Sequence, residues 1–344
     1  MTSREIVLKT LEFDGPGRIP RQLWTLPWAT ARYPQELAKI HADFPPDIRT
    51  APSFLKTPTG VSGDPYAVGE YRDEWGCTFT NVQQGVIGEI KRPLIAEWED
   101  LAKVREPVEL LSVDVDAVNG FCRGTEQFVL AGCCPRPWER VQFLRGSENA
   151  MLDLAAEEPA LMALIQRLHQ FYLKKLEIWA RTEVDALMFM DDWGAQRSLL
   201  ISPRVWRAIF KPLYRDYIEL AHRHHKKIFM HSDGYILDII PDLIELGLDA
   251  LNSQLFCMGV EEVGRFAGKL TFWGELDRQH LLVRGTTDEV AQAVRDVHRA
   301  LCRNGGVIAQ MEFGPGARPE NVYAGFQTWN SLTADQTNTD APRS

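Results

Sequence analysis

A histidine and an aspartate two residues apart, His231 and Asp233, follow a short apolar run near the middle of the chain. Residues two apart on an extended segment project to the same side, so the imidazole and the carboxylate can converge on one point. Gly234 then lets the backbone turn away. A histidine beside a carboxylate can bind a metal ion or act as an acid and base pair. This stretch is therefore the first candidate for the site of chemistry.

Polar side chains also follow four other apolar segments of the chain. They are Asp191 and Asp192, Asn252 and Gln254, Glu275 and Asp277, and Gln310 and Glu312. If these segments are parallel strands of a barrel, their carboxyl ends surround one mouth, which is where active sites are built on that fold. Charged and amide groups are costly to desolvate without partners, so we expect a functional pocket there.

Three of these residues, His231, Asp233 and Glu312, can supply the nitrogen and oxygen ligands of a divalent ion such as zinc. The alternative is a histidine hydrogen-bonded to a neighbouring carboxylate without metal, because the sequence has no HExxH-like spacing. Asp191 and Asp192 are catalytic candidates, since two carboxylates close together raise one pKa and create a proton donor. Their alternative reading is a salt-bridged or helix-capping pair.

Other polar and aromatic residues near the expected strand ends are candidates for catalysis or substrate contact. Trp24, Trp193 and Trp273 can form the flat walls of a pocket, although tryptophans of this kind also serve as core. The polar candidates are Gln196 as a further catalytic residue, with Asn252, Gln254 and Glu275 for substrate binding.

Alternating strands and helices must position these residues. Apolar strands are expected at 21–24, 127–133, 186–190, 228–231, 250–252, 269–273 and 307–311, with helical segments between most of them. This pattern favours a single (β/α)8 barrel over an open doubly wound sheet. No glycine-rich dinucleotide fingerprint or GxxxxGK[ST] loop supports the nucleotide-binding alternatives. We expect the barrel over 1–332, with 27–95 partly forming a cap or pocket wall, and a flexible tail over 333–344.

Composition narrows the classes of function. The chain has 344 residues, 45% of them hydrophobic, and a net charge of −9 with its basic residues scattered. Neither a nucleic-acid footprint nor binding to an anionic membrane is indicated. The six irregularly spaced cysteines predict reduced thiols, and the charged N-terminus lacks a signal peptide. We therefore expect a cytoplasmic protein.

Four segments together resemble the uroporphyrinogen decarboxylase superfamily, which also contains corrinoid-linked methyltransferases. They are residues 1–20 (MTSREIVLKTLEFDGPGRIP), 190–234 (MDDWGAQRS to HSDG), 239–254 (IIPDLIELGLDALNSQ) and 319–328 (PENVYAGFQT). The resemblance covers nearly the whole chain, and it implies a single (β/α)8 barrel with its pocket at the carboxyl face of the strands.

The resemblance implies different chemistry for the two branches of this superfamily. The decarboxylases use no metal and hold the substrate carboxylates with arginines near the first strand, where this chain has Arg21. The methyltransferases bind zinc through a His-x-Cys-Gly segment and a later cysteine. This chain keeps His231 and Gly234, but has Asp233 in place of the first cysteine and Glu312 near the later ligand.

Our leading hypothesis is accordingly a metal-assisted methyltransferase linked to a corrinoid or a small methyl donor, with a corrinoid protein as a partner. The first alternative is a decarboxylase acting on uroporphyrinogen or another polycarboxylate. The second is a non-catalytic tetrapyrrole binder. A homodimer is the default assembly.

Overall fold

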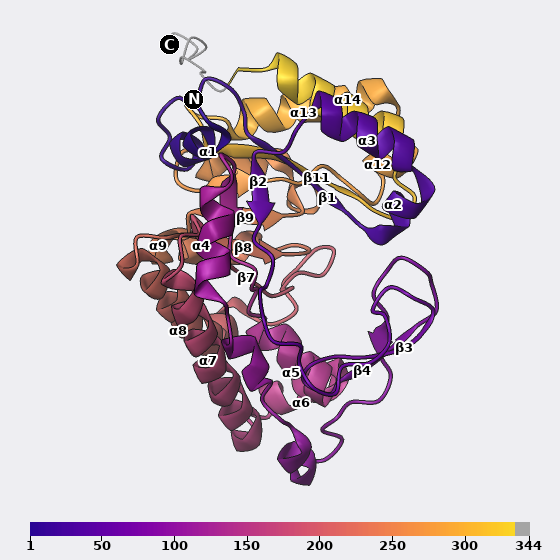
Figure 1. Cartoon of the computed structure of the whole chain (residues 1–344), viewed down its shortest axis with the longest axis vertical. Helices are drawn as coiled ribbons and strands as arrows, with labels where there is room; N and C mark the ends of the chain where they lie inside the picture. The colour runs from indigo at the N-terminus through magenta and orange to yellow at the C-terminus, as the bar shows by residue number, and fades with distance from the viewer. Residues whose placement is uncertain (334–344) are drawn as a thin grey trace.

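Eight parallel strands form a nearly closed barrel in the computed structural model, which describes residues 1–333 (Figure 1). This confirms the predicted (β/α)8 fold. The barrel strands are β1 (Arg21–Thr25), β2 (Ile48–Thr50), β6 (Phe128–Leu130), β7 (Ala186–Met190), β8 (Lys227–Ser232), β9 (Ala250–Ser253), β10 (Thr271–Trp273) and β11 (Val307–Phe313). The flexible tail that we expected lies, beyond Thr333, outside the described residues.

The strands are hydrogen-bonded in the order β1-β11-β10-β9-β8-β7-β6-β2, so the seam of the barrel falls between β1 and β2. One backbone bond crosses it, from Asp47 N to Arg21 O at 2.9 Å. The Asp47 carboxylate adds to the closure, because it accepts from Arg21 N at 2.9 Å and pairs with the guanidinium of Arg18. β2 is the barrel strand that the sequence did not predict, since only Ile48 of its three residues is apolar and buried, whereas the equally short β6 and β10 are buried throughout.

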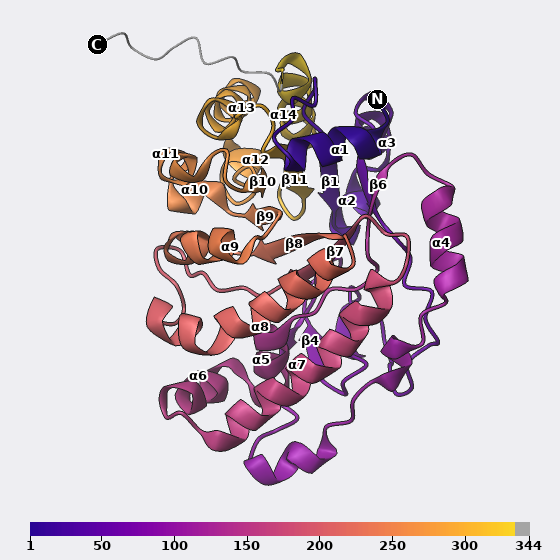
Figure 2. The same ribbon diagram turned by 90° about the vertical axis from the view of Figure 1, so that its left-hand side faces the viewer.

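Helices cover the outside of the barrel, as Figure 2 shows for α7, α8 and α9. Most of the apolar core lies between this layer and the strands, and a second cluster that includes Phe128, Phe229 and Ile308 fills the barrel interior. The α-helices are α1 (Ser3–Leu11), α2 (Pro27–Arg32), α3 (Pro34–Asp43), α4 (Val115–Arg123), α5 (Pro137–Arg145), α6 (Ser147–Ala155), α7 (Pro159–Ala180), α8 (Pro203–Arg223), α9 (Ile240–Leu246), α10 (Leu255–Met258), α11 (Val260–Val263), α12 (Leu281–Arg284), α13 (Thr287–Leu301) and α14 (Pro319–Ser331). The 3₁₀ helices are η1 (Trp98–Lys103), η2 (Val108–Leu111), η3 (Leu237–Ile239) and η4 (Gly264–Phe266).

Local sequence explains where the long helices begin. Ser202 accepts a hydrogen bond from Val205 N and precedes a proline in the first turn of α8. Thr286 and Glu289 form a reciprocal capping box at the start of α13. None of the helices within residues 1–333 is both long and apolar enough to cross a membrane.

A small antiparallel sheet interrupts the strand and helix alternation between β2 and β6. It consists of β3 (Gly69–Arg72), β4 (Thr78–Asn81) and β5 (Glu89–Ile90). Arg140 of α5 ties it down through an ion pair with Asp73, and Trp75 packs edge-on against Phe171 of α7. In Figure 1 this sheet lies on the side of the molecule where α2 follows the carboxyl end of β1.

Candidate active site

Alternation along β7 and β8 decides which side chains reach the mouth. Phe229 belongs to the cluster inside the barrel, so His231 and Asp233, two and four residues later, continue the inward-facing series. On β7, Met188 packs against the same interior cluster. Asp192 therefore continues the inward series, while Asp191 faces the helices.

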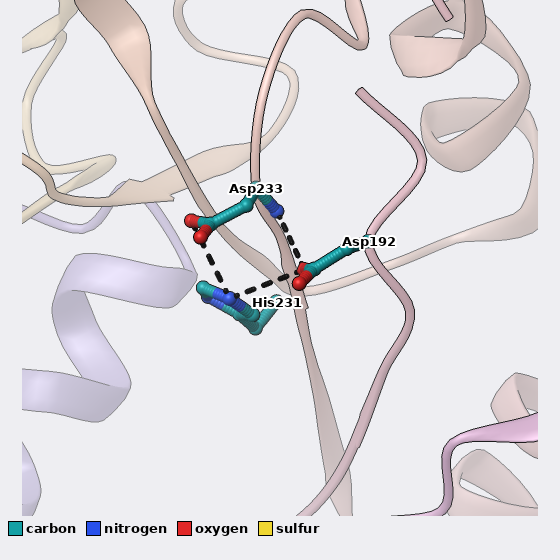
Figure 3. Close-up of side chains that lie close together, drawn as sticks. All are labelled: Asp192, His231 and Asp233. Carbon is teal, nitrogen blue, oxygen red and sulfur yellow. Dashed lines mark hydrogen bonds and ion pairs between the residues drawn. The ribbon is translucent and has the colours of Figure 1, made fainter. Parts of the chain in front are cut away.

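Asp192, His231 and Asp233 converge at the mouth (Figure 3). The Nε2 atom of His231 lies 3.5 Å from Oδ1 of Asp192 and 3.6 Å from Oδ1 of Asp233. One ligand atom from each of the three residues lies within 4.8 Å of the others. The arrangement can hold a metal ion, or a proton on the imidazole between two carboxylates.

Backbone contacts between two glycines bring the loops after β7 and β8 together. A Cβ atom added to Gly234 would lie 2.1 Å from the carbonyl oxygen of Gly194, and Gly234 also has a positive φ of 77°. The close approach lets Gly194 N donate to Asp233 O at 3.0 Å, and Asp233 N donate to Oδ1 of Asp192 at 2.9 Å. The backbone of the β8 loop therefore fixes the carboxylate of Asp192, and the two glycines allow the loops to come this close.

Asn252 of β9 fixes the imidazole of His231. Its Nδ2 donates to the carbonyl of Trp273 and to Oε1 of Gln310, which leaves Oδ1 facing Nδ1 of His231 at 2.6 Å. Oδ1 is an acceptor, so Nδ1 of His231 carries a proton. In the neutral ring the lone pair is then on Nε2, on the side of Asp192 and Asp233.

Two tryptophans pack beside this histidine. The ring of Trp24 lies 5.4 Å from that of His231, and it meets Trp273 edge-on at 5.1 Å. Trp273 is fully buried and donates from Nε1 to Gln22 at 2.9 Å, so it supports Trp24 from inside the barrel. Trp24 therefore forms one wall of the mouth.

Arg278, in the loop after β10, connects three carboxylates. It binds Asp233, lies 2.8 Å from Glu312, and its Nε lies 3.5 Å from Glu275. Burial alone would lower the pKa of Arg278, but the three acidic groups raise it above its ordinary value. Arg278 was not among the residues predicted from the sequence, although it follows Glu275 and Asp277 in the same strand-end segment.

Glu275 lies beside a cavity of about 170 Å³ next to the mouth. Its side chain is 2% exposed, and burial raises its pKa to about 8, with Asp233 and Glu312 adding to the shift and Arg278 opposing it. The cavity lining includes Gln254, Phe256, Cys257, Glu275, Leu276 and Arg278.

Glu139 of α5 is a second acidic residue near the mouth that the sequence did not indicate. Burial raises its pKa, Arg136 at 3.6 Å opposes the shift, and Asp192 adds to it. A helix residue is hard to find from strand-end patterns, so no sequence signal pointed to it.

Two expected roles are corrected by these contacts. Among the described residues, the ligand atoms that lie close enough to share one ion belong to Asp192, His231 and Asp233 and not to Glu312, whose carboxylate lies 2.8 Å from Arg278. Asp191 accepts from the backbone N–H groups of Trp138 and Glu139 at 2.8 and 2.9 Å, and from the Tyr214 hydroxyl. It caps α5, which is the alternative reading of the acidic pair, and burial raises its pKa.

Two further substrate candidates lie away from the mouth. Trp193 is fully buried and stacks on Trp138 at 5.8 Å, with its Nε1 bonded to Tyr214, so it belongs to the core. Arg21 begins β1 and therefore lies at the amino end of the barrel, where it approaches Asp47 at 3.9 Å. Neither contacts the Asp192, His231 and Asp233 group.

The remaining candidates are close to the mouth. Gln254 accepts from Gly234 N at 3.1 Å and lines the cavity beside Glu275. Gln196 lines the same cavity and donates to Gln279 at 3.5 Å. Both therefore stay candidates for contact with a ligand.

Sequence comparison assigns the family. The uroporphyrinogen decarboxylase (URO-D) family model matches residues 72–331. The chain belongs to the uroporphyrinogen decarboxylase family. No curated protein matches the sequence.

One solved structure supports the same architecture. A methyltransferase from Methanosarcina mazei is similar over 96% of this chain and 99% of its own, with a TM-score of 0.67 and 13% identity. A B12-independent methionine synthase from Shewanella sp. W3-18-1 is more distant, with a TM-score of 0.43 and 12% identity over 90% of this chain and 95% of its own. At such identity the likeness to the methyltransferase shows the barrel fold alone.

Proposed function

We propose that this member of the uroporphyrinogen decarboxylase family is a methyltransferase-like enzyme that works with a divalent metal ion held by Asp192, His231 and Asp233. The observation that carries the proposal is the convergence of the His231 Nε2 lone pair with two carboxylates at the barrel mouth. The methyltransferase branch places a histidine and glycine of the same spacing at its zinc site, which adds support.

The residues present fit a divalent ion. Imidazole nitrogen and carboxylate oxygen are both zinc ligands, and three protein ligands leave a position for substrate, as in catalytic sites. The buried Oδ1 of Asp233 has no hydrogen-bond partner among the described residues, and the opposite ring nitrogen of His231 is held by Asn252. A metal-binding histidine is commonly oriented by such a second hydrogen bond.

The donor set is harder than the thiolate set of the methyltransferase branch. Aspartates in place of cysteines lower the preference for soft metals. Cys257, the thiol beside the cavity, does not compensate, because burial raises its pKa and its S–H donates to Gln254 O. When bound, a divalent ion would supply Lewis acidity toward the substrate group that gives or accepts the methyl.

The chain's own residues would orient the reaction. Asn252 holds the His231 ring, and Arg278 holds one oxygen of Asp233 while leaving the other toward Nε2. Trp24 shields one side of the imidazole from water. The small sheet β3–β5 would form part of the pocket wall, since Gly85 of its connecting loop lies against Trp28 of α2.

The charges at the mouth favour this proposal over decarboxylation of a polycarboxylate. The arginines near the first strand, Arg18 and Arg21, are tied to Asp47 at the amino end of the barrel. At the mouth, Arg278 is shared by three carboxylates. A polyanionic substrate would therefore meet an acidic surface. A corrinoid protein or a small methylated molecule is the donor that we propose.

The metal content of protein purified without added metal tests the proposal. We expect close to one divalent ion per chain in the wild type and a large loss in His231→Ala. Methyl transfer from methylcobalamin or a small methylated donor, followed by absorbance or mass spectrometry, should fall with the metal content. A metal-free wild type whose activity survives His231→Ala would overturn the proposal.

A further inference from the structure

The cavity next to the mouth contains a buried carboxylate that nothing in the described structure neutralises by hydrogen bonding. The side chain of Glu275 is 2% exposed, and neither of its oxygens has a hydrogen-bond partner among residues 1–333. Arg278 is its nearest cation, but their 3.5 Å separation is an ion pair without a hydrogen bond, and that guanidinium is shared with Asp233 and Glu312. An acceptor left in this state is costly unless a ligand or water supplies the donors.

The cavity is built to enclose a small molecule. Its volume of about 170 Å³ is well below the roughly 300–1,000 Å³ typical of pockets for drug-sized ligands. Phe256 and Leu276 supply apolar lining, and Gln196 and Gln254 supply side-chain amides. An occupant therefore needs a few apolar carbons and a group that donates hydrogen bonds.

The charged residues around the cavity determine which charge the hydrogen-bonding group of the ligand should carry. Asp233, Glu312 and Asp277 all act on Glu275 as like charges, whereas Arg278 is the single cation among the groups that act on it most strongly. Asp277 already accepts from the backbone N–H groups of Gln279 and His280. The local excess of negative charge favours a cation over a neutral molecule and disfavours an anion.

We propose that this cavity binds a small organic ammonium ion, whose N–H groups donate to the carboxylate of Glu275 once that side chain turns toward the cavity from its buried position, while its alkyl part packs against Phe256 and Leu276. The inference rests on the proposed function only in taking the mouth as the place where substrate binds. An amine bound there would lie on the far side of Arg278 from Asp233 and could be the head group of the methyl donor or acceptor.

Calorimetric titration with three probes of similar size and different charge tests this inference: butylammonium, butan-1-ol and butanoate. The full-length chain is used as purified, at a pH of about 9, between the pKa of Glu275 of about 8 and that of an alkylammonium, about 10. We expect butylammonium to bind at least tenfold more tightly than butanol, with no binding of butanoate. In Glu275→Gln the ammonium affinity should fall at least tenfold, because glutamine removes the charge and keeps the shape.

Two further variants keep the test decisive. Glu262→Gln makes the same charge change at an exposed site on α11 and should leave the affinity unchanged. Cys257→Phe fills the cavity from its wall and should abolish binding of butylammonium and butan-1-ol, which covers the case in which Glu275→Gln does not fold. Equal affinities for the probes, wild-type affinity in Glu275→Gln or in Cys257→Phe, or no binding at all would overturn the inference.

The outcome can be separated from that of the metal proposal. The titrations are repeated on protein treated with a chelator and on His231→Ala, and the ammonium affinity should persist in both because Glu275 does not contact the three candidate metal ligands. If the metal proposal fails, the ammonium site can still be found; if the ammonium site fails, metal content is unaffected.

Discussion

Asn252 and His231 lie on adjacent strands with Oδ1 and Nδ1 2.6 Å apart, and this single hydrogen bond sets which ring nitrogen faces Asp192 and Asp233. The same amide is held from behind by Trp273 O and Gln310. The orientation of the candidate metal ligand is thus determined by a network inside the barrel, and not by the groups at the mouth.

Replacement of Asn252 by alanine should weaken metal binding by roughly 10–100-fold, as loss of an orienting partner does in other metal sites. Asn252→Asp keeps an acceptor for Nδ1 and should restore much of the affinity. Competition with a chromophoric chelator measures both values. Equal affinities in Asn252→Ala and the wild type would show that the ring needs no such support.

Asp191 and Asp192 should give opposite results although they are adjacent. Asp191→Ala removes the cap of α5 and leaves the Tyr214 hydroxyl without its acceptor, so we expect a loss of about 2–3 kcal/mol in the free energy of unfolding with metal content retained. Asp192→Ala should lose metal with a stability change below about 1 kcal/mol. Denaturant unfolding and elemental analysis of the two variants measure these effects. If Asp191→Ala lost as much metal as Asp192→Ala, the assignment of Asp191 to the helix cap would be contradicted.

Removal of Arg278 should destabilise the fold because it leaves buried acidic groups without a counter-charge. For Arg278→Gln we expect the free energy of unfolding to fall by about 2–4 kcal/mol. This is below the full range for buried ion pairs because the Arg278 side chain is partly exposed. Addition of Glu275→Gln should recover part of that loss, a coupling of about 1–2 kcal/mol in a double-mutant cycle. Arg265→Gln, which breaks an exposed pair with Glu262, is the control and should cost less than about 0.5 kcal/mol.

The raised pKa of Glu275 predicts a pH dependence of stability. The ordinary value is 4.5 and the folded value is about 8, so between these the folded state binds more protons than the unfolded state. Stability from this group is therefore present at low pH and declines as pH rises through that interval, by at most about 1.4 kcal/mol per unit. The free energy of unfolding of Glu275→Gln, taken relative to that of the wild type, should therefore rise by on the order of 3–5 kcal/mol from pH 5 to pH 9.

Unfolding titrations across this range, with Glu262→Gln as the control, measure the difference between the two curves. Parallel curves for the wild type and Glu275→Gln would mean that the carboxyl ionises normally in the folded chain.

The local pattern of apolar and polar residues was sufficient to predict most strands of the barrel. The strands that carry His231, Asn252 and Gln310 are apolar runs bounded by polar residues, and their predicted ranges overlap the observed strands. The sequence also placed Glu275 and Glu312 at the mouth. Which of two adjacent carboxylates faces inward could not be decided, because that depends on which alternate residues of β7 fill the barrel.

The sequence could not show which residues each side chain of the site contacts. Glu312 lies near the end of β11, one residue beyond the predicted strand, and its carboxylate pairs with the guanidinium of Arg278, which depends on how the loop after β10 folds. Glu139 reaches the mouth from a helix, and Arg21 lies at the opposite end because it begins its strand instead of ending it. Contacts between loops and helices fix these placements, and no spacing along the chain encodes them.

The barrel wall should open more easily at the seam between β1 and β2 than elsewhere. A single backbone bond and the Asp47 carboxylate join these strands, whereas β8, which carries His231, lies near the middle of a continuous ladder on the other side of the ring. Segments with few backbone bonds exchange their amide hydrogens through small local openings, so the seam should be the first part of the wall to exchange. The barrel can therefore open locally between β1 and β2 while β8, which carries His231, keeps its register.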